Sequence, residues 1–444
     1  MKIWRRTSAA IVALGTAVAG LVAAPTGAGA VAPAASATAE TQSKVTLTWW
    51  TWMADTPSLI KMFEKAYPNI SIAPVPNYGS GTPFYNKLTT ALAAGTAPCI
   101  TQVEYDHLPQ FATDMTDIAQ YDTKYKNDFP SWLWNEVDQH GKLLSIPGDI
   151  GPMGMMYQPA VFKKYNLPLP TTFTIFASDA VKLHKDNPKM YLTYFPPGDQ
   201  DYLEALFWEA GAFPYHLSPN GTWTVSLDGP IERKVVNYWA KLIKEGAIAP
   251  VTDETPEWNH QVSTDTYAVY LGAAWFPAAI DAYINPHHPQ TFAVTAMPQW
   301  TVGGHADANW GGSSYGVTKD CPAADVKDAA LFVAYMNTAP SALKFLENPV
   351  GADVYPADVH RASVAQFSKP TPHFIGNINQ EFSKLSSGVP TKFQWSPWDT
   401  ELGTYVSTQF GAAAAGKQTW LRALQQVQSN LVGYAKSAGY SVQS

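Results

Sequence analysis

The chain has 444 residues, of which 46% are hydrophobic and 15% charged, and its formal net charge is −7. This length predicts two or three domains with large cores. The negative charge and the lack of Lys/Arg clusters beyond the N-terminal segment argue against a nucleic-acid-binding protein, because neutralising phosphates requires clustered cations.

The N-terminal segment has the order of a secretory signal peptide. Three basic residues precede an apolar stretch between residues 9 and 24, and small residues follow. We expect cleavage after Ala30 or Ala37, so that residues 1–37 comprise signal peptide and leader and the protein is exported. A retained N-terminal anchor is the alternative, but the stretch is short for a span of roughly 20 apolar residues.

Strand and helix signals alternate from residue 44 onward. Val45, Leu47 and Trp49 have the two-residue period of a strand, and "TPSLIKMFEKAYPN" has the pattern of a helix capped by Thr56. A strand "ISIAPV", a helix "TPFYNKLTTALAAG" and a strand "CITQVEY" follow. This order predicts an α/β fold with a mostly parallel sheet covered by helices.

Aromatic and acidic side chains stand where two of these strands end. Trp50 and Trp52 follow the first strand, and Glu104 ends the third. Ligands of open α/β sheets bind beyond the carboxyl ends of the strands. We therefore expect these residues to line a crevice, whereas Trp49 continues the inward period and packs the sheet.

The rest of the chain repeats the mixed pattern. Amphipathic helices are predicted in "DQDYLEALFWEAGAF" and "PIERKVVNYWAKLIKEGAI", and a strand followed by a short helix in "TYAVYLGAAWFPAAI". The segment "ANWGGSSYGVTK" is typical of a loop that leads into a strand. Helices with one apolar face are predicted from residue 326 and at the C-terminus, the latter stopping at Gly439.

Carbohydrate recognition requires flat apolar faces together with planar polar groups. Tryptophan supplies the faces and carboxylates bind pairs of hydroxyls, and connecting segments of this chain contain both. The sequence therefore predicts a sugar site. Its candidate residues are Trp50, Trp52, Glu104, Asp149, Trp275, Trp310, Tyr355, Trp395 and Trp398.

A secreted glycoside hydrolase is the alternative, because Glu104, Asp149, Asp201 and Asp399 could supply the paired carboxyl groups of such an enzyme. Sequence alone does not give the distance between them, and no nucleophile elbow or zinc-protease motif is present. No stretch has zinc-ligand spacing, and the near-match to a P-loop beginning at Gly411 lacks the hydroxyl that holds magnesium. We expect no metal, no cofactor and no catalysis.

The chain has two cysteines, Cys99 and Cys321. An even number in an exported protein is compatible with one disulfide. The spacing does not decide whether the two residues meet, because bridging depends on a geometry that sequence does not give.

The whole set of segments resembles family 1 extracellular solute-binding proteins, which capture substrates for bacterial ABC sugar importers. The resemblance extends from about residue 45 to 440 and depends on the order of the segments rather than on a single diagnostic motif. Its segments include "FEKAYPNISI", "YNKLTTALAAGTAPCITQVEYDHLPQFA", "IPGDIGPMGMMYQPAVFKKYNLPLPTTF", "YWAKLIKEGAI", "AVYLGAAWFPAAI", "NWGGSSYGVTK" and "LVGYAKSAGY".

This resemblance implies a two-lobed, type II periplasmic-binding-protein-like fold with a hinge of crossing segments, in which each lobe has a mostly parallel sheet covered by helices. Lobe one would comprise residues 44–150 and 314–357, and lobe two residues 151–313 and 358–444. The family pattern implies ligand contacts at Trp50, Glu104, Asp149 and Trp310, with Trp275 facing them. The crossings are expected near Asp149–Met156, Trp310–Tyr315 and Tyr355–Arg361.

The resemblance also implies partners and a location. An oligosaccharide would be the ligand and the permease subunits of an ABC importer the partner of a monomeric protein. No cysteine precedes Cys99, so the lipid-modified cysteine common in relatives from single-membrane bacteria is missing. The protein would be extracellular or cell-surface associated, or periplasmic if the host has an outer membrane. A non-sugar solute, such as a polyamine, peptide or metal chelate, bound by the same fold remains a further alternative.

Overall fold

The computed structural model describes residues 44–53, 56–75, 81–139, 141–287, 290–346, 355–358, 373–390 and 392–444. The expected signal peptide, with its cleavage sites after Ala30 or Ala37, lies outside these residues. Among the helices of these ranges, none combines the length and the apolar character needed to cross a lipid bilayer.

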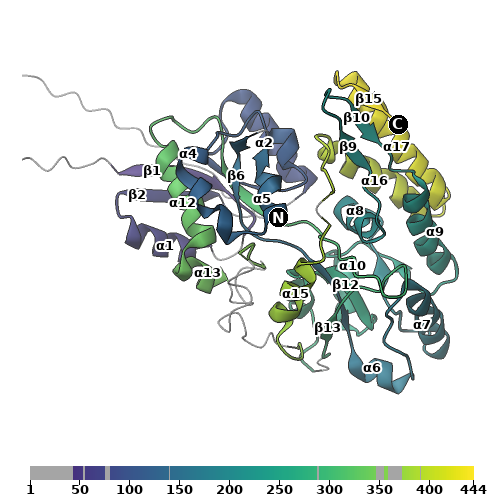
Figure 1. Cartoon of the computed structure of the whole chain (residues 1–444). Coiled ribbons are helices and arrows are strands. Elements are labelled where there is room, and N and C mark those ends of the chain that lie inside the picture. Colours follow the sequence, from purple (N-terminus) through teal and green to yellow (C-terminus); the bar gives the residue numbers. More distant parts are fainter. Residues whose placement is uncertain are drawn as a thin grey trace, which may run out of the picture. The chain divides into compact units, whose positions relative to one another are not determined.

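A five-stranded sheet forms the centre of the part of the chain that we call lobe one (Figure 1). The first three strands pair in parallel, and the fourth is antiparallel to both of its neighbours. In spatial order the strands are β2 (Ile70–Val75), β1 (Val45–Trp50), β3 (Ile100–Glu104), β14 (Ser313–Val317) and β6 (Ser145–Pro147).

Aromatic side chains of lobe one pack against this sheet. Trp49 is fully buried and makes edge contacts with Tyr315 and Phe332, at ring-centroid distances of 6.0 and 5.2 Å. The helices of this lobe are α1 (Thr56–Ala66), α2 (Thr82–Ala94), α3 (Leu108–Phe111), α4 (Ala119–Asp122), the 3₁₀ helix η1 (Thr123–Asp128), α5 (Ser131–Val137), α12 (Val326–Thr338) and α13 (Pro340–Leu346). A short hairpin of β4 (Asp138–Gln139) and β5 (Lys142–Leu143) adjoins them.

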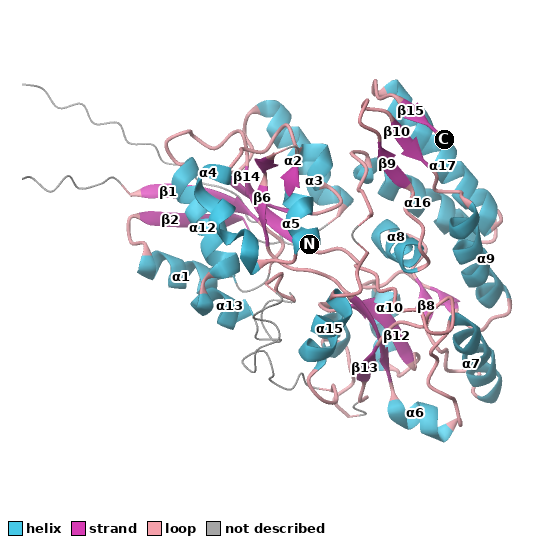
Figure 2. Cartoon of the chain, viewed as in Figure 1, coloured by secondary structure: helices cyan, strands magenta, loops and turns pink. Residues whose placement is uncertain are grey.

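Three small sheets form the second part of the chain, which we call lobe two (Figure 2). The first contains β12 (Val269–Ala273), β7 (Met153–Tyr157) and β13 (Ala293–Thr295). The second contains β11 (Ala249–Pro250) and β8 (Tyr194–Phe195), and the third contains β15 (Val442–Gln443), β10 (Trp223–Val225) and β9 (Tyr215–Leu217).

Helices surround the sheets of lobe two. The pattern of α9 is typical: Pro230 occupies its first turn, and its buried residues Val235, Val236, Trp239 and Leu242 recur on one face. The helices are α6 (Pro159–Lys164), α7 (Phe173–Asp186), α8 (Gln200–Glu209), α9 (Pro230–Lys244), α10 (Pro256–Ser263), α11 (Phe276–Asp281), α15 (Ile378–Ser386), α16 (Asp399–Ala414) and α17 (Trp420–Ser437).

The expectation of a mostly parallel sheet is correct for lobe one and wrong for the central sheet of lobe two. There β7 is antiparallel to both β12 and β13. The sequence of β7, "MGMMY", is an apolar run that is buried on both faces except at its last residue. Such a run identifies a buried strand but contains no information on the direction of its partners.

A disulfide joins Cys99 and Cys321, which are 222 positions apart in the sequence. Cys99 directly precedes β3, and Cys321 follows β14, the strand that pairs with β3. The Thr318 N–H donates to the Cys99 carbonyl oxygen at 3.0 Å, so hydrogen bonds and a covalent bond connect the same two segments.

We expect Glu209→Gln to stabilise the protein at pH 8 and to have little effect near pH 4.5. Glu209 is 3% exposed at the end of α8, and burial raises the pKa of its carboxyl group to about 9. The folded state therefore retains a proton that the unfolded state releases above its ordinary pKa of about 4.3, and stability is lost as pH rises between these values. The expected gain at pH 8 is at most about 5 kcal/mol, measured by denaturant unfolding.

The matched control is Glu245→Gln, which changes a carboxyl group 41% exposed after α9. We expect it to alter stability by less than about 0.5 kcal/mol at either pH. Equal effects of Glu209→Gln at pH 4.5 and pH 8 would show that the proton is not retained.

Candidate functional site

Four buried polar side chains connect the ends of β1 and β3 with the start of β14. Thr51 Oγ1 donates to Gln102 Oε1 at 2.6 Å, and Gln102 Nε2 donates to Ser313 Oγ at 2.8 Å. Ser313 donates to Asp149 Oδ1 through its N–H at 2.8 Å and through its hydroxyl group. This chain of hydrogen bonds fixes Asp149 next to the strand ends.

Asp149 lies in a segment that connects lobe one to lobe two, residues 148–152, and a second such segment, residues 309–312, runs beside it. The Trp310 N–H donates to the Gly151 carbonyl oxygen at 2.7 Å. Gly151 permits this approach because a Cβ atom there would overlap the Trp310 carbonyl oxygen.

Residues 355–357 form a third segment at the same place. The Ile150 N–H donates to the Tyr355 carbonyl oxygen at 3.0 Å, and the Ala357 N–H donates to the Gly148 carbonyl oxygen at 3.1 Å. The three expected crossings are therefore adjacent in space. Of the third, only residues 355–358 are described, and residues 359–361 lie outside the described ranges.

Two indoles adjoin these crossing segments. The rings of Trp275 and Trp310 have centroids 4.8 Å apart, and Trp275 Nε1 donates to the Trp310 carbonyl oxygen at 3.2 Å. Trp310 is 3% exposed and also packs against Tyr202 and Phe276, whereas Trp275 is half-buried. Trp275 thus combines a fixed orientation with an accessible surface.

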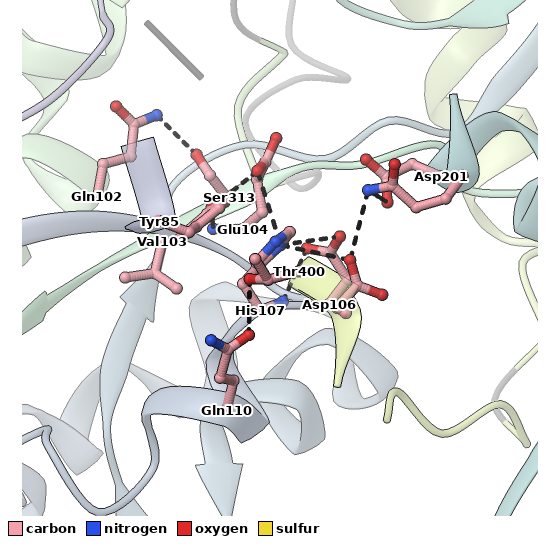
Figure 3. Close-up of polar contacts among 12 residues, drawn as sticks. Tyr85, Gln102, Val103, Glu104, Asp106, His107, Gln110, Asp201, Ser313 and Thr400 are labelled. Carbon is pink, nitrogen blue, oxygen red and sulfur yellow. Dashed lines mark hydrogen bonds and ion pairs between the residues drawn. The ribbon is translucent and has the colours of Figure 1, made fainter. Parts of the chain in front are cut away.

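Acidic groups gather where β3 ends and α3 begins (Figure 3). Tyr85 donates its hydroxyl to Glu104 Oε2 at 2.7 Å, and its ring stacks on that of His107 at a centroid distance of 3.5 Å. His107 Nδ1 lies 3.1 Å from Asp106 Oδ2 and 3.9 Å from Glu104 Oε2. One imidazole therefore stands between two carboxyl groups.

Lobe two contributes two more carboxyl groups to this cluster. Asp399, at the start of α16, places Oδ2 3.6 Å from His107 Nδ1. Gln200 Nε2 donates to Asp201 Oδ1 at 3.2 Å and to Asp399 Oδ2 at 3.4 Å. One oxygen each from Asp106, Asp201 and Asp399 lies within 4.8 Å of the other two, so the acid cluster joins both lobes.

Burial and mutual repulsion change the pKa values of the cluster. Burial, followed by the charge of Asp106, raises the pKa of Glu104 to about 7 and that of Asp201 and Asp399 well above the ordinary value. Burial alone would lower the pKa of His107, but Asp106 and Asp399 raise it to about 9. Burial would likewise raise the pKa of Asp106, yet the neighbouring His107 lowers it below its ordinary range.

The other tryptophans predicted at the strand ends lie on lobe one. Trp50 and Trp52 are half-buried and make edge contacts with Phe84 of α2, at centroid distances of 6.4 and 5.2 Å. The Trp52 N–H donates to Gln102 Oε1 at 3.3 Å, which places residue 52 beside the hydrogen-bonded chain that leads to Asp149.

Three predicted site residues lie in well-packed surroundings. Tyr355 is 2% exposed and donates its hydroxyl to the Asn379 carbonyl oxygen at 3.0 Å. Trp395 packs against Trp208 at a centroid distance of 4.4 Å, and Trp398 packs against Trp223 at 5.5 Å. Ligand contact by these three residues stays a prediction, because the contacts that the structure shows for them are with other residues of the protein.

Several polar residues of the site were not selected from the sequence. His107 directly follows the acidic end of β3, and this position in the sequence could have identified it as a site residue. Gln102, Gln110 and Thr400 had no such signal, because they are common polar residues in distant segments. Gln110 accepts a hydrogen bond from Thr400 Oγ1 at 2.8 Å, a second polar contact between α3 and α16.

Two lobes that are connected by three adjacent crossing segments, with aromatic and polar groups at the strand ends, define a protein that binds a ligand between its lobes. The family model of the bacterial extracellular solute-binding proteins matches residues 42–342. The chain belongs to this family. A search of curated protein sequences gave no match.

Solved structures of sugar-binding proteins have the same fold. The ABC-transporter-associated binding protein of B. animalis subsp. lactis Bl-04, in complex with β-1,6-galactobiose, is 25% identical, with a TM-score of 0.79 and coverage of 90% of this chain and 100% of that chain. The galacto-N-biose/lacto-N-biose I-binding protein of Bifidobacterium longum, with lacto-N-biose, is 20% identical, with a TM-score of 0.79 and coverage of 90% and 99%. An ABC substrate-binding protein of Listeria monocytogenes, with cycloalternan, is 18% identical, with a TM-score of 0.73 and coverage of 89% and 100%.

Proposed function

We propose that the protein captures a carbohydrate, most specifically an oligosaccharide, between its two lobes and delivers it to the permease of a bacterial ABC importer. The observation that supports this function best is the half-buried Trp275 indole, fixed by its hydrogen bond to Trp310 beside the crossing segment of Asp149. An indole face in this position can stack on the C–H face of a sugar ring, while nearby carboxyl groups bind hydroxyls.

The free energies of such contacts are sufficient for binding with a micromolar dissociation constant. A micromolar dissociation constant corresponds to about −8 kcal/mol. Aromatic contacts contribute about 1 kcal/mol each and hydrogen bonds to charged groups about 1.5–3 kcal/mol. A few contacts of each kind therefore reach this range. The ligand must bind the closed arrangement of the lobes more tightly than the open one, since only differential affinity shifts the equilibrium.

The remaining features of this proposal follow the family. The protein is exported by the N-terminal signal, acts outside the cytoplasm as a monomer, and binds its ligand without converting it. Lobe one comprises residues 44–150 and 314–357, and lobe two comprises residues 151–313 and 358–444. The ligand contacts proposed first are those of Trp275 and Glu104, with Trp50, Trp52 and Asp149 at the edge of the same site.

Trp275→Ala is expected to weaken binding of the cognate sugar about tenfold. A thermal-shift screen against mono- to hexasaccharides identifies the ligand, because bound ligand raises the melting temperature by mass action. Titration calorimetry then compares the variant with the wild type. Loss of one stacked ring costs about 1–1.5 kcal/mol, which is about a factor of ten in affinity.

Trp300→Ala is the matched control, since Trp300 is also half-buried but packs against Phe173 and Tyr238 within lobe two. It should leave affinity unchanged. Unchanged affinity in Trp275→Ala would remove this indole from the site. If the protein shortened the oligosaccharides during incubation, the glycoside hydrolase alternative would replace the binding function.

A further inference from the structure

The oxygens of Asp106, Asp201 and Asp399 have the geometry of ligands to one ion. They come from the end of β3, from α8 and from α16, and each lies within 4.8 Å of the other two. Ca²⁺ binds oxygens at 2.3–2.6 Å, so two ligands on opposite sides of one ion are about 4.6–5.2 Å apart. A single ion can therefore contact all three carboxyl groups.

Buried oxygens in this cluster lack hydrogen-bond partners among the described residues. They include Asp399 Oδ1, on a side chain that is 0% exposed, whereas Asp106 Oδ2 lies 3.1 Å from His107 Nδ1. Glu204, one turn beyond Asp201 on α8, is 1% exposed with both carboxyl oxygens unpartnered, and it interacts electrostatically with Asp399 and Asp106. Buried carboxyl oxygens without partners are costly, and a bound cation would remove this cost.

The positive charge available within the cluster is small. Among the described residues, His107 is the basic side chain that lies within 4.0 Å of Asp106 and Asp399. Glu104, Asp106, Asp201, Glu204 and Asp399 together outnumber this single imidazole. The excess of carboxyl groups favours a hard cation with oxygen ligands rather than zinc, which binds nitrogen and sulfur ligands.

We propose that Asp106, Asp201 and Asp399 bind a divalent cation of the calcium type at the contact between the two lobes. The ion would hold the β3–α3 connection of lobe one against α8 and α16 of lobe two. It would thereby favour the arrangement in which the lobes are in contact. Binding of the ion does not require that the transported solute be a sugar.

The test is calorimetric titration of EDTA-treated, dialysed protein with CaCl₂ and with MgCl₂, without any sugar. We expect one saturable calcium site per chain with a dissociation constant below about 1 mM, the range of extracellular calcium modules. Asp399→Asn and Asp201→Asn should each weaken it at least tenfold. Asp179→Asn is the control, because Asp179 is a 2% exposed carboxyl group on α7 outside the cluster.

Circular dichroism establishes whether each variant is folded. If Asp399→Asn does not fold, Asp201→Asn still tests the proposal, because Asp201 is only half-buried. No saturable heat up to 10 mM of either ion, or equal affinity in all variants, would overturn the proposal. A thermal shift with methylammonium chloride but not with CaCl₂ would also overturn it, in favour of an organic ammonium group. Intact sugar binding in the same preparation would leave the transport function standing, so the two proposals can fail separately.

Discussion

Gly151→Ala is expected to destabilise the protein by at least about 4 kcal/mol, a cost that puts it among the most severe single substitutions. The added Cβ would overlap the Trp310 carbonyl oxygen and lie 2.9 Å from its carbonyl carbon. This carbonyl group cannot retreat easily, because it belongs to a backbone segment that is hydrogen-bonded to Gly151 itself and to Trp275. The measurement is unfolding by guanidinium chloride, monitored by tryptophan fluorescence.

Gly433→Ala provides the matched control for this substitution. Gly433 lies within α17, and a Cβ atom there would meet no heavy atom within 4 Å. Alanine in a helix interior is about 1 kcal/mol more favourable than glycine, so this variant should be slightly more stable than the wild type. A stability of Gly151→Ala within 1 kcal/mol of the wild type would contradict the rigid contact between the two crossing segments.

Removal of the disulfide by Cys99→Ser with Cys321→Ser is expected to cost about 2–5 kcal/mol. The bond closes a loop with a sequence separation of 222, and it joins segments that are neighbours in the sheet of lobe one. Without it the unfolded chain gains conformational freedom, whereas the backbone hydrogen bond from Thr318 to Cys99 still joins the two segments in the folded chain. The melting temperature of the wild type should fall to that of the double variant when a reductant is added.

The double variant supplies the control, because reductant should not change its melting temperature. If reductant leaves the wild-type melting temperature unchanged while mass spectrometry shows free thiols, the disulfide makes no contribution to stability.

Local sequence pattern predicted much of the secondary structure. The helix with apolar face Val326, Ala329, Ala330, Val333 and Ala334 is α12, and all five residues are buried. Period-two and period-3.6 patterns report which face of an element is apolar, and caps and prolines report where it ends. Pairing direction has no such local signature, and the antiparallel neighbours of β7 were therefore not predicted.

The candidate site was less predictable than the fold. Glu104 and Asp106 belong to one strand end, so their proximity follows from the sequence. The contacts of Asp106 with Asp201 and Asp399 depend on how α8 and α16 are placed by the whole fold, and no local pattern contains that information. Ligand contact by Trp395 and Trp398 stays a prediction, and their position in a connecting segment does not reveal that they pack against Trp208 and Trp223.

The position of β14 has a consequence for how the chain folds. This strand pairs with β3 on one side and β6 on the other, although β6 ends at Pro147 and β14 begins at Ser313. The N-terminal sheet therefore stays incomplete until a strand encoded far downstream inserts into its middle. Contacts of such high sequence separation slow folding. An emerging polypeptide would expose unpaired edges of β3 and β6 in the meantime, and such edges favour aggregation.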